Sequence, residues 1–308
     1  MSGKVLNVPK VTVCVVTYNQ EQYIKQCLQS IVDQETEFEF EVIVSDDCST
    51  DGTRKIIQQF ADKYSCIKPL LRERNIGALE NFIDTHSSAT GKYICHMDGD
   101  DYWLPTKLQK QADFLDKNSE CNLVWTRSLF EKGEVQLPDL INNKNFFTKN
   151  FYRGDIIRFI SIGTNSSHMY RHKFSLNKLP NFGVVDYFKN VVIVNEGFAS
   201  FVSNEPLTVY RIGVGISSSG TNIIHLILCS MQFFFESYPD QKSDLFSSSL
   251  LLSYSCLKRK KINFFIKFFT LSLKCLSVEA LRKLTSSFEV YKMLRIPTFK
   301  NGNDKAVK

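Results

Sequence analysis

Short apolar runs alternate with segments of helical periodicity along the first 130 residues of this 308-residue chain. Residues 11–17 (VTVCVVT) are rich in β-branched side chains and predict a buried strand, whereas residues 21–34 place apolar side chains at helical spacing. The same patterns predict strands at residues 40–45, 67–72, 92–97 and 122–130, and helices at residues 53–64, 78–87 and 105–117. This alternation is typical of an α/β fold with a doubly wound, mainly parallel sheet flanked by helices.

Polar motifs follow three of the predicted strands. They are TYN at residues 17–19, DDCSTD at residues 46–51 and DGDD at residues 98–101. In open parallel sheets, ligands bind in the crevice beyond the carboxyl ends of the strands. We therefore expect the three motifs to lie close together and to form one ligand site.

The DGDD motif places Asp98, Asp100 and Asp101 where their charges repel one another. Mg²⁺ and Mn²⁺ prefer oxygen ligands and share them with substrate phosphates, so Asp98 and Asp100 are candidate metal ligands. An acidic turn that caps the next helix is the alternative. An EF-hand loop does not fit, because its glycine and glutamate positions are Trp103 and Gln109. The chain has no G-x-G-x-x-G or Walker A motif to hold phosphates by backbone amides.

Two further loops are expected to border the same crevice. Asp47 could accept hydrogen bonds from a base or a ribose, while residues 49–51 are suited to cap the following helix. Arg74 and Asn75 precede the next helix and could reach the crevice as well. A solvated surface charge is the alternative for Arg74.

The order and spacing of four segments are similar to those of the family 2 glycosyltransferases of bacterial surface-polysaccharide synthesis. The segments are VTVCVVTYNQEQYIKQCLQSIVDQ, EVIVSDDCSTDGT, RNIGALENF and GKYICHMDGDDYWLPTKLQKQADFL. The resemblance is close over residues 9–130 and loose over residues 150–215. It implies a GT-A-like fold, a nucleotide-sugar donor, for which UDP is the expected nucleotide, and sugar transfer with inversion at the anomeric carbon.

The resemblance also implies roles for individual residues. The expected donor-binding residues are Thr17, Tyr18, Asn19, Asp46, Asp47, Arg74, Asn75 and Asp98, together with Tyr210 and Arg211. Asp98 and Asp100 are expected to hold a divalent cation, Mn²⁺ or Mg²⁺. Cys48 stands where the family's first acidic motif usually has a glycine, so the backbone conformation of that loop is an open question.

An inverting transfer needs a general base that takes the proton of the acceptor hydroxyl. The candidate is Asp186 in FGVVDYFKN, the only acidic residue between Asp155 and Glu196. Such enzymes often have an acidic pair at this place, but Val185 precedes Asp186 here. An ordinary charge on a helix surface is the alternative. In PLTVYRIGVGIS, residues 206–217, Tyr210 and Arg211 could contact the diphosphate, and the Gly/Ser stretch could form a loop over the donor.

Charge is distributed unevenly along the chain. Residues 256–308 contain 13 Lys or Arg and 3 Asp or Glu, whereas the rest of the chain has a slight acidic excess. A basic helix with an aromatic face can lie on an anionic membrane, which would suit a lipid-linked glycan acceptor on a polyprenyl-diphosphate carrier. A helical subdomain that packs its Phe face on the main domain is the alternative. Nucleic-acid binding is disfavoured, because a helical arrangement gives no Arg-rich stripe and the main domain would repel phosphates.

These patterns divide the chain into a transferase domain at residues 1–220 and a helical tail at residues 221–308. Within the first, residues 9–130 are expected to bind the nucleotide and residues 131–220 the acceptor. Nine scattered cysteines without a CxxC pair, and a start without an apolar signal-peptide core, predict a cytoplasmic protein, peripheral on the inner membrane at most. A sugar nucleotidyltransferase, or a catalytically silent nucleotide-binding scaffold, are the alternative functions. The first would need a glycine-rich basic loop after the first strand, where this chain has TYNQEQY.

Overall fold

The computed structural model describes residues 8–141, 149–173, 180, 182–183, 185–214, 223–294 and 297. The Gly/Ser stretch that is expected to form a loop over the donor falls mostly on residues 215–222, outside the described residues.

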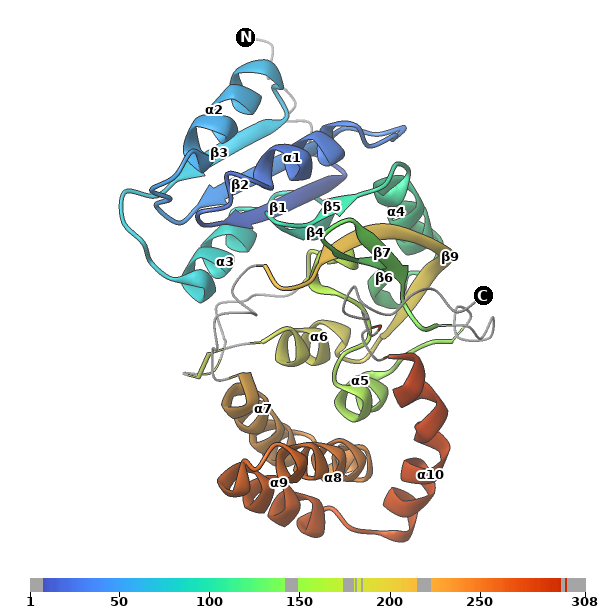
Figure 1. The fold of residues 1–308 in the computed structure, drawn as a ribbon. Helices are drawn as coiled ribbons and strands as arrows, with labels where there is room; N and C mark the ends of the chain where they lie inside the picture. The colour runs from blue at the N-terminus through green and yellow to red at the C-terminus, as the bar shows by residue number, and fades with distance from the viewer. Residues whose placement is uncertain are drawn as a thin grey trace, which may run out of the picture.

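The first half of the chain forms the parallel part of the sheet, as the sequence predicts. Strands β1 (Val11–Thr17), β2 (Phe40–Asp46), β3 (Ile67–Leu71) and β4 (Tyr93–Asp98) are parallel neighbours in the order β3-β2-β1-β4. They alternate with helices α1 (Ile24–Val32), α2 (Thr53–Lys63), α3 (Ala78–Ser87) and α4 (Lys107–Lys117). Helices α1 and α2 lie on one face of these strands and α3 on the other (Figure 1).

Strand periodicity places one apolar cluster on each face of the sheet. Val11, Val13 and Val15 of β1 join the buried cluster formed with α1, α2 and α4, whereas Cys14 joins the cluster on the opposite face. Side chains alternate along a strand, so the mostly apolar sequence of β1 is explained by burial on both sides.

The sheet is mainly parallel, as expected, but antiparallel strands join it in its second half. β6 (Cys121–Lys132) and β9 (Phe198–Arg211) are parallel, but β8 (His168–Arg171) pairs antiparallel with both β4 and β6. β5 (Tyr102–Trp103) and β7 (Val135–Pro138) add antiparallel edges. Strand β9 continues through Pro206, because a register shift beside the Arg127–Pro206 pair accommodates the proline.

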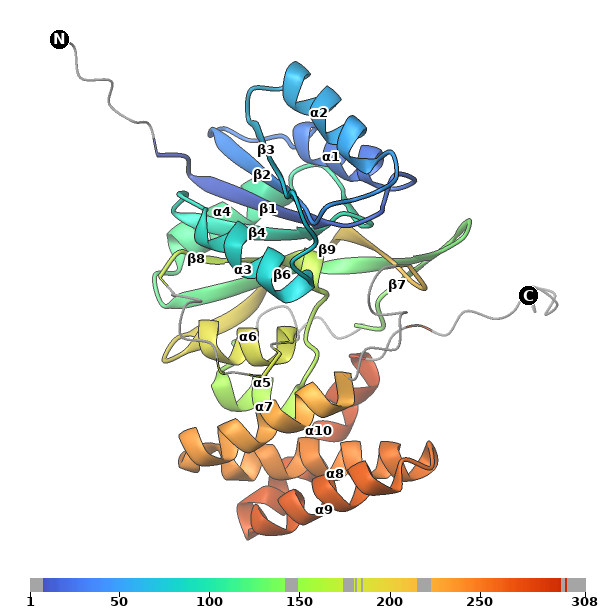
Figure 2. The ribbon, with the colours of Figure 1, turned by 90° about the vertical axis from the view of Figure 1, so that its left-hand side faces the viewer.

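Helices build the part of the molecule remote from β3 (Figures 1 and 2). They are α5 (Arg153–Phe159), α6 (Asp186–Val194), α7 (Ile223–Ser237), α8 (Lys242–Lys258), α9 (Ile262–Lys274) and α10 (Val278–Met293), with a short 3₁₀ turn η5 (Pro239–Gln241). A second 3₁₀ turn, η2 (Asn165–Ser167), lies beside the end of β4. None of the helices in the described ranges is long and apolar enough to cross a bilayer.

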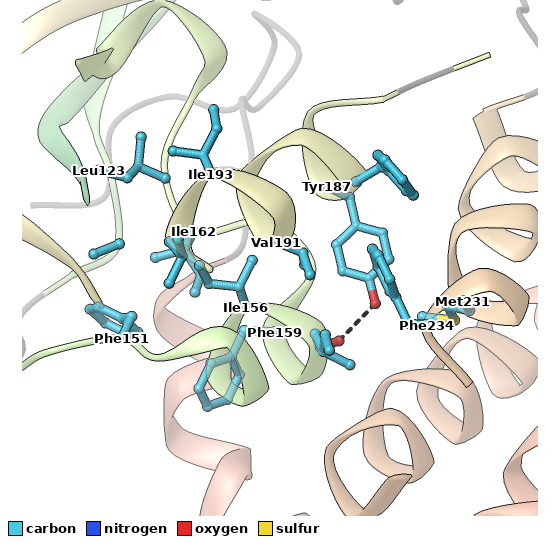
Figure 3. Close-up of a cluster of buried hydrophobic side chains, with 14 of the residues drawn as sticks. Leu123, Phe151, Ile156, Phe159, Ile162, Tyr187, Val191, Ile193, Met231 and Phe234 are labelled. Atoms are coloured by element: carbon cyan, nitrogen blue, oxygen red, sulfur yellow. Dashed lines mark hydrogen bonds between the residues drawn. The ribbon is translucent and has the colours of Figure 1, made fainter. Parts of the chain in front are cut away.

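One apolar cluster joins these helices to the sheet. It runs from Trp125 of β6 through Phe188 of α6 and Phe234 of α7 to Phe268 of α9. Figure 3 shows part of it, where the Tyr187 hydroxyl donates a hydrogen bond of 2.9 Å to the carbonyl oxygen of Ile157. The tail therefore packs on the main domain, as one of the two interpretations of its sequence predicts, and the apolar core continues across the expected boundary at residue 220.

Candidate active site

Three loops at the carboxyl ends of β1, β2 and β4 are tied to one another, as the sequence predicts. The backbone N–H of Asp47 donates to the carbonyl oxygen of Thr17 over 3.0 Å, and the N–H of Gly99 donates to that of Val16 over 3.0 Å. A Cβ atom on Gly99 would lie 2.5 Å from Oε1 of Gln20 and 2.9 Å from the Thr17 side chain. Only glycine therefore lets the DGDD turn pack so closely on the loop after β1.

Asp47 connects the loop after β2 to the RNIG loop. Its buried carboxylate accepts hydrogen bonds from the backbone N–H groups of Ile76, over 2.7 Å, and Gly77, over 3.0 Å. Asn75 donates back to the carbonyl oxygen of Asp47 over 3.0 Å. These bonds place Arg74, whose side chain is exposed, at the same edge of the sheet as Asp47.

The side chains of Asp46 and Asn19 accept hydrogen bonds that fix the loop after β2. The Asp46 carboxylate accepts hydrogen bonds from the hydroxyl and the backbone N–H of Ser49. The Asn19 side chain accepts from the N–H of Thr50 over 2.8 Å. Cys48 has a φ of +63°, in the left-handed region that favours glycine, so the loop keeps a glycine-like conformation although a cysteine occupies the position. The side chain of Tyr18, beside this loop, is 43% exposed.

Asp98 lies at the end of β4 with its side chain 32% exposed. Its Oδ1 lies 3.0 Å from Nε2 of His96, and its Oδ2 accepts a 3.2 Å hydrogen bond from Nδ2 of Asn165. Burial opposes the charge of Asp98, but His96 and Asn165 outweigh burial and lower the pKa of its carboxyl group below the usual value. Asp98 is therefore held as a carboxylate that faces the site.

Asp100 and Asp101 carry the unfavourable charge of the cluster. Burial, and next the charge of Asp98, raise the pKa of Asp100 to about 6. Burial and the charge of Asp100 raise the pKa of Asp101 well above its usual value. Asp101 accepts hydrogen bonds from the Ser166 hydroxyl, over 2.5 Å, and from the backbone N–H of Arg211, over 2.9 Å. Asp101 thus binds the protein itself, which leaves Asp98 and Asp100 for a ligand.

The donor atoms of this site suit a hard divalent cation that keeps most of its coordination sites for a ligand. Asp98 and Asp100 offer oxygen atoms, and the raised pKa of Asp100 reflects negative charge that a cation would neutralise. Within the described ranges, no group of three or more His, Cys, Asp or Glu side chains could hold a metal ion. Mg²⁺ at phosphate sites is commonly bound by one or two carboxylates together with the phosphates of the ligand, and the pair Asp98 and Asp100 matches this donor set.

Arg211 holds β9 against the aspartate loop. Its guanidinium group donates to Oε1 of Glu131 over 2.9 Å, to Oε1 of Gln26 over 2.5 Å, and to the carbonyl oxygen of Asp100. It also lies over the ring of Tyr102, 4.8 Å from its centre. The guanidinium is engaged with the protein, so its expected contact with a diphosphate stays a prediction. Tyr210, the other residue expected there, packs edge-on against Phe130 at 5.8 Å.

Asp186 reaches the same site through two side chains that the sequence analysis missed. It is the first residue of α6, and its carboxylate is 55% exposed. Nζ of Lys189 lies 3.3 Å from Oδ1 of Asp186 and donates a 2.8 Å hydrogen bond to Oδ1 of Asn165, whose Nδ2 donates to Asp98. Lys189 is 2% exposed and lies over the ring of Phe82. A lysine on the apolar side of a helix was the available signal, because buried lysines need acidic or polar partners.

A family model described as "Glycosyl transferase family 2" matches residues 12–175. The chain belongs to the family 2 glycosyltransferases. The matched part includes the loops after β1, β2 and β4 and the Asn165 turn, whereas Asp186 lies beyond it.

Curated relatives agree with this membership. The chain spans 57% of the length of the first curated relatives it matches, uncharacterised mycobacterial proteins that are 35% identical over 203 residues, or 64% of this chain. It is 31% identical over 206 residues to TuaG of Bacillus subtilis (strain 168), named for teichuronic acid biosynthesis, covering 66% of this chain and 79% of TuaG.

Solved structures confirm the GT-A-like α/β fold of this family 2 glycosyltransferase. S. aureus TarS 1–349 in complex with UDP has a TM-score of 0.62 at 19% identity, covering 96% of this chain and 94% of that one. The mannosyltransferase PcManGT of Pyrobaculum calidifontis, in complex with GDP-Man and Mn²⁺, has a TM-score of 0.58 at 15% identity, covering 92% and 80%. At these identities the likeness extends to the fold alone.

Proposed function

We propose that this family 2 glycosyltransferase transfers a sugar, with inversion, from a UDP-sugar to a hydroxyl group of a glycan acceptor. The observation that carries the proposal is the bridge from Asp98 through Asn165 and Lys189 to Asp186. It joins a carboxylate suited to the donor side with a half-exposed carboxylate suited to the acceptor side. The fold shared with a protein solved with UDP supports the choice of nucleotide.

On the donor side, the edge formed by Thr17, Tyr18 and Asn19, with Asp46 and Asp47, would surround the nucleoside. Arg74 and Asn75 would approach it from the RNIG loop, and Tyr210 and Arg211 from the end of β9. Asp98 and Asp100 would hold a divalent cation, Mn²⁺ or Mg²⁺. When bound, the cation supplies positive charge that stabilises the diphosphate leaving group. The fold shared with a mannosyltransferase solved with Mn²⁺ supports this cofactor.

On the acceptor side, Asp186 would act as the general base. Its carboxylate would take the proton of the acceptor hydroxyl while the hydroxyl oxygen forms a bond to the anomeric carbon. The bond from that carbon to the diphosphate would break from the opposite face, and the nucleoside diphosphate would leave with the bonding electrons. Half-exposure leaves the Asp186 carboxylate accessible, and the Lys189 ammonium group 3.3 Å away would orient it. Positioned bases contribute roughly 10² to 10⁴ in rate.

The acceptor is proposed to be a polyprenyl-diphosphate-linked glycan of a surface polysaccharide, such as a capsule or an O-antigen. Helix α9 supports a membrane-bound acceptor, because it exposes Ile262, Ile266, Phe269 and Leu273 on one face. Exposed Lys258, Lys260, Lys261, Lys267 and Lys274 lie in the same region. An apolar stripe bordered by lysines suits an anionic membrane surface. The protein would thus act peripherally on the cytoplasmic face of the membrane, and the relative named for teichuronic acid biosynthesis supports the pathway class.

The donor site is tested by calorimetry with UDP in the presence of Mn²⁺ and of EDTA, and by the variants Asp100→Ala and Asp186→Asn. We expect metal-dependent UDP binding to the wild type and to Asp186→Asn, and none to Asp100→Ala. In a transfer assay, Asp186→Asn should lower kcat by roughly 10² to 10⁴. Unchanged UDP binding by Asp100→Ala would refute the metal assignment. Full activity of Asp186→Asn would refute the base assignment.

A further inference from the structure

A chain of hydrogen bonds runs from the protein core to Asp98. The hydroxyl oxygen of Tyr170 lies 2.6 Å from Nδ1 of His86, and Nε2 of His86 lies 2.9 Å from Nδ1 of His96. Nε2 of His96 in turn lies 3.0 Å from Oδ1 of Asp98. Tyr170, His86 and His96 are all at most 2% exposed. Three aromatic side chains from β8, α3 and β4 therefore converge on one oxygen of the proposed donor site.

The proton positions in this chain follow from its chemistry. Burial, and next the neighbouring His96, lower the pKa of His86 well below its usual value, so the imidazole is neutral. A neutral imidazole has one donor and one acceptor nitrogen. The Asp98 carboxylate only accepts, so His96 donates from Nε2, and a His96 ring with that single proton accepts at Nδ1 from Nε2 of His86. Nδ1 of His86 then accepts from the Tyr170 hydroxyl. When each ring carries a single proton, every link is satisfied with both protons on Nε2.

The chain does not lead to solvent at its inner end. Tyr170 is 1% exposed and belongs to the apolar cluster beneath the sheet. A path that ends in the core cannot exchange protons with water, so proton conduction is excluded as its purpose. The chain fixes the direction of a hydrogen bond instead. The contacts to Oδ2 of Asp98 are longer, 3.2 Å from Asn165 and 3.5 Å from Ser166.

We propose that Tyr170, His86 and His96 are positioning residues that hold Oδ1 of Asp98 and present Oδ2 to the donor. This inference rests on the proposed function for the role of Asp98, but the hydrogen-bonded chain itself does not. Removing a partner that orients a ligating carboxylate typically lowers metal affinity or activity 10- to 100-fold.

The same cluster provides a matched control. His168 is 1% exposed and stacks on His96 with ring centres 5.7 Å apart. Neither of its ring nitrogens has a hydrogen-bond partner among the described residues. His168→Phe therefore removes a buried imidazole from the cluster without breaking the hydrogen bonds that link Tyr170 to Asp98.

The first test is long-range ¹⁵N–¹H NMR of the free protein with ¹⁵N-labelled histidine, which assigns the tautomer of each ring. We expect the Nε2–H tautomer for both His86 and His96 at neutral pH. Tyr170→Phe, which keeps the ring, should shift the Nδ1 resonance of His86 because that nitrogen loses its donor. An Nδ1–H tautomer at His96 would overturn the inference, and this result does not depend on nucleotide binding.

The second test is calorimetric UDP affinity in Mn²⁺, with thermal melting to verify folding. His96→Leu should weaken UDP binding 10- to 100-fold. Tyr170→Phe should weaken it less, and His168→Phe should change it less than twofold. Wild-type affinity in a folded His96→Leu protein, or in Tyr170→Phe if His96→Leu does not fold, would overturn the positioning role. A wild type that binds no UDP would refute the proposed function. The tautomers of His86 and His96 would still decide whether the hydrogen bonds from Tyr170 to Asp98 are formed.

Discussion

Asp100 is a residue at which the site lowers the stability of the fold. It is 7% exposed, and its pKa rises from 3.8 to about 6 because of burial and the charge of Asp98. The folded protein therefore holds the Asp100 proton more tightly than the unfolded chain does. It follows that raising the pH from about 4 through about 6 destabilises the fold, because ionised Asp100 is better solvated when unfolded.

Asp100→Asn should remove this pH-dependent cost. In EDTA above pH 7, the free energy of unfolding of the variant should exceed that of the wild type by at most about 3 kcal/mol, the equivalent of the pKa shift. Near pH 4 the two proteins should be equally stable, because Asp100 is protonated in the folded wild type. Urea denaturation at pH 4, 6 and 8 measures the difference. A variant less stable than the wild type at pH 8 would contradict the expectation.

The residues of the site differ in how far the sequence could reveal them. Asp47 and Asp98 follow strands directly, so a strand pattern and a motif suffice to place them at one edge. Asn165 and Lys189 come from the loosely patterned half of the chain, where neither residue has a motif. Their role depends on β8 returning antiparallel beside β4, a pairing that local sequence periodicity does not encode.

At the scale of elements, the parallel strands and their helices could be predicted because each has its own periodicity. The second half of the sheet could not, since its order depends on long-range pairing between β4, β8 and β6. The turn before η2 illustrates this. Gly163 has a φ of +113°, and a Cβ atom there would lie 2.5 Å from Cδ1 of the buried Trp125. That contact joins elements far apart in the sequence.

Gly163→Ala should destabilise the protein by about 2 to 4 kcal/mol, because backbone strain adds to the overlap with the Trp125 ring. Gly133→Ala is the matched control. Gly133 has a φ of +61°, but a Cβ atom there would meet no described atom within 4 Å. The control should therefore lose only about 1 to 2 kcal/mol from backbone strain. Equal losses of unfolding free energy in the two variants, measured by urea denaturation, would show that the Trp125 side chain moves to accommodate the Cβ atom. This result would contradict tight packing at this turn.

For the whole molecule, the two interpretations of the basic tail are compatible. One side of α9 packs into the core through Phe268 and Leu271, while the other side exposes Ile266 and Phe269. Sequence alone indicated a basic helix with an aromatic face but could not divide its apolar residues between core and surface, because that depends on α8. Removal of the tail would also remove core residues such as Phe268, so a truncation cannot separate membrane binding from folding.

Point substitutions on the exposed side of α9 can separate the two. We expect the wild type to sediment with vesicles that contain phosphatidylglycerol, and less so at high salt, because the lysines beside the stripe contribute. The double variant Ile266→Glu/Phe269→Glu should bind at least tenfold more weakly, since each side chain loses about 1 to 2 kcal/mol of apolar burial. Val135→Glu, on the 52% exposed side chain of a β7 residue, is the control and should bind as the wild type does. Equal binding by all three proteins would mean that the α9 stripe is not the membrane contact, and the proposed lipid-linked acceptor would then lose its structural support.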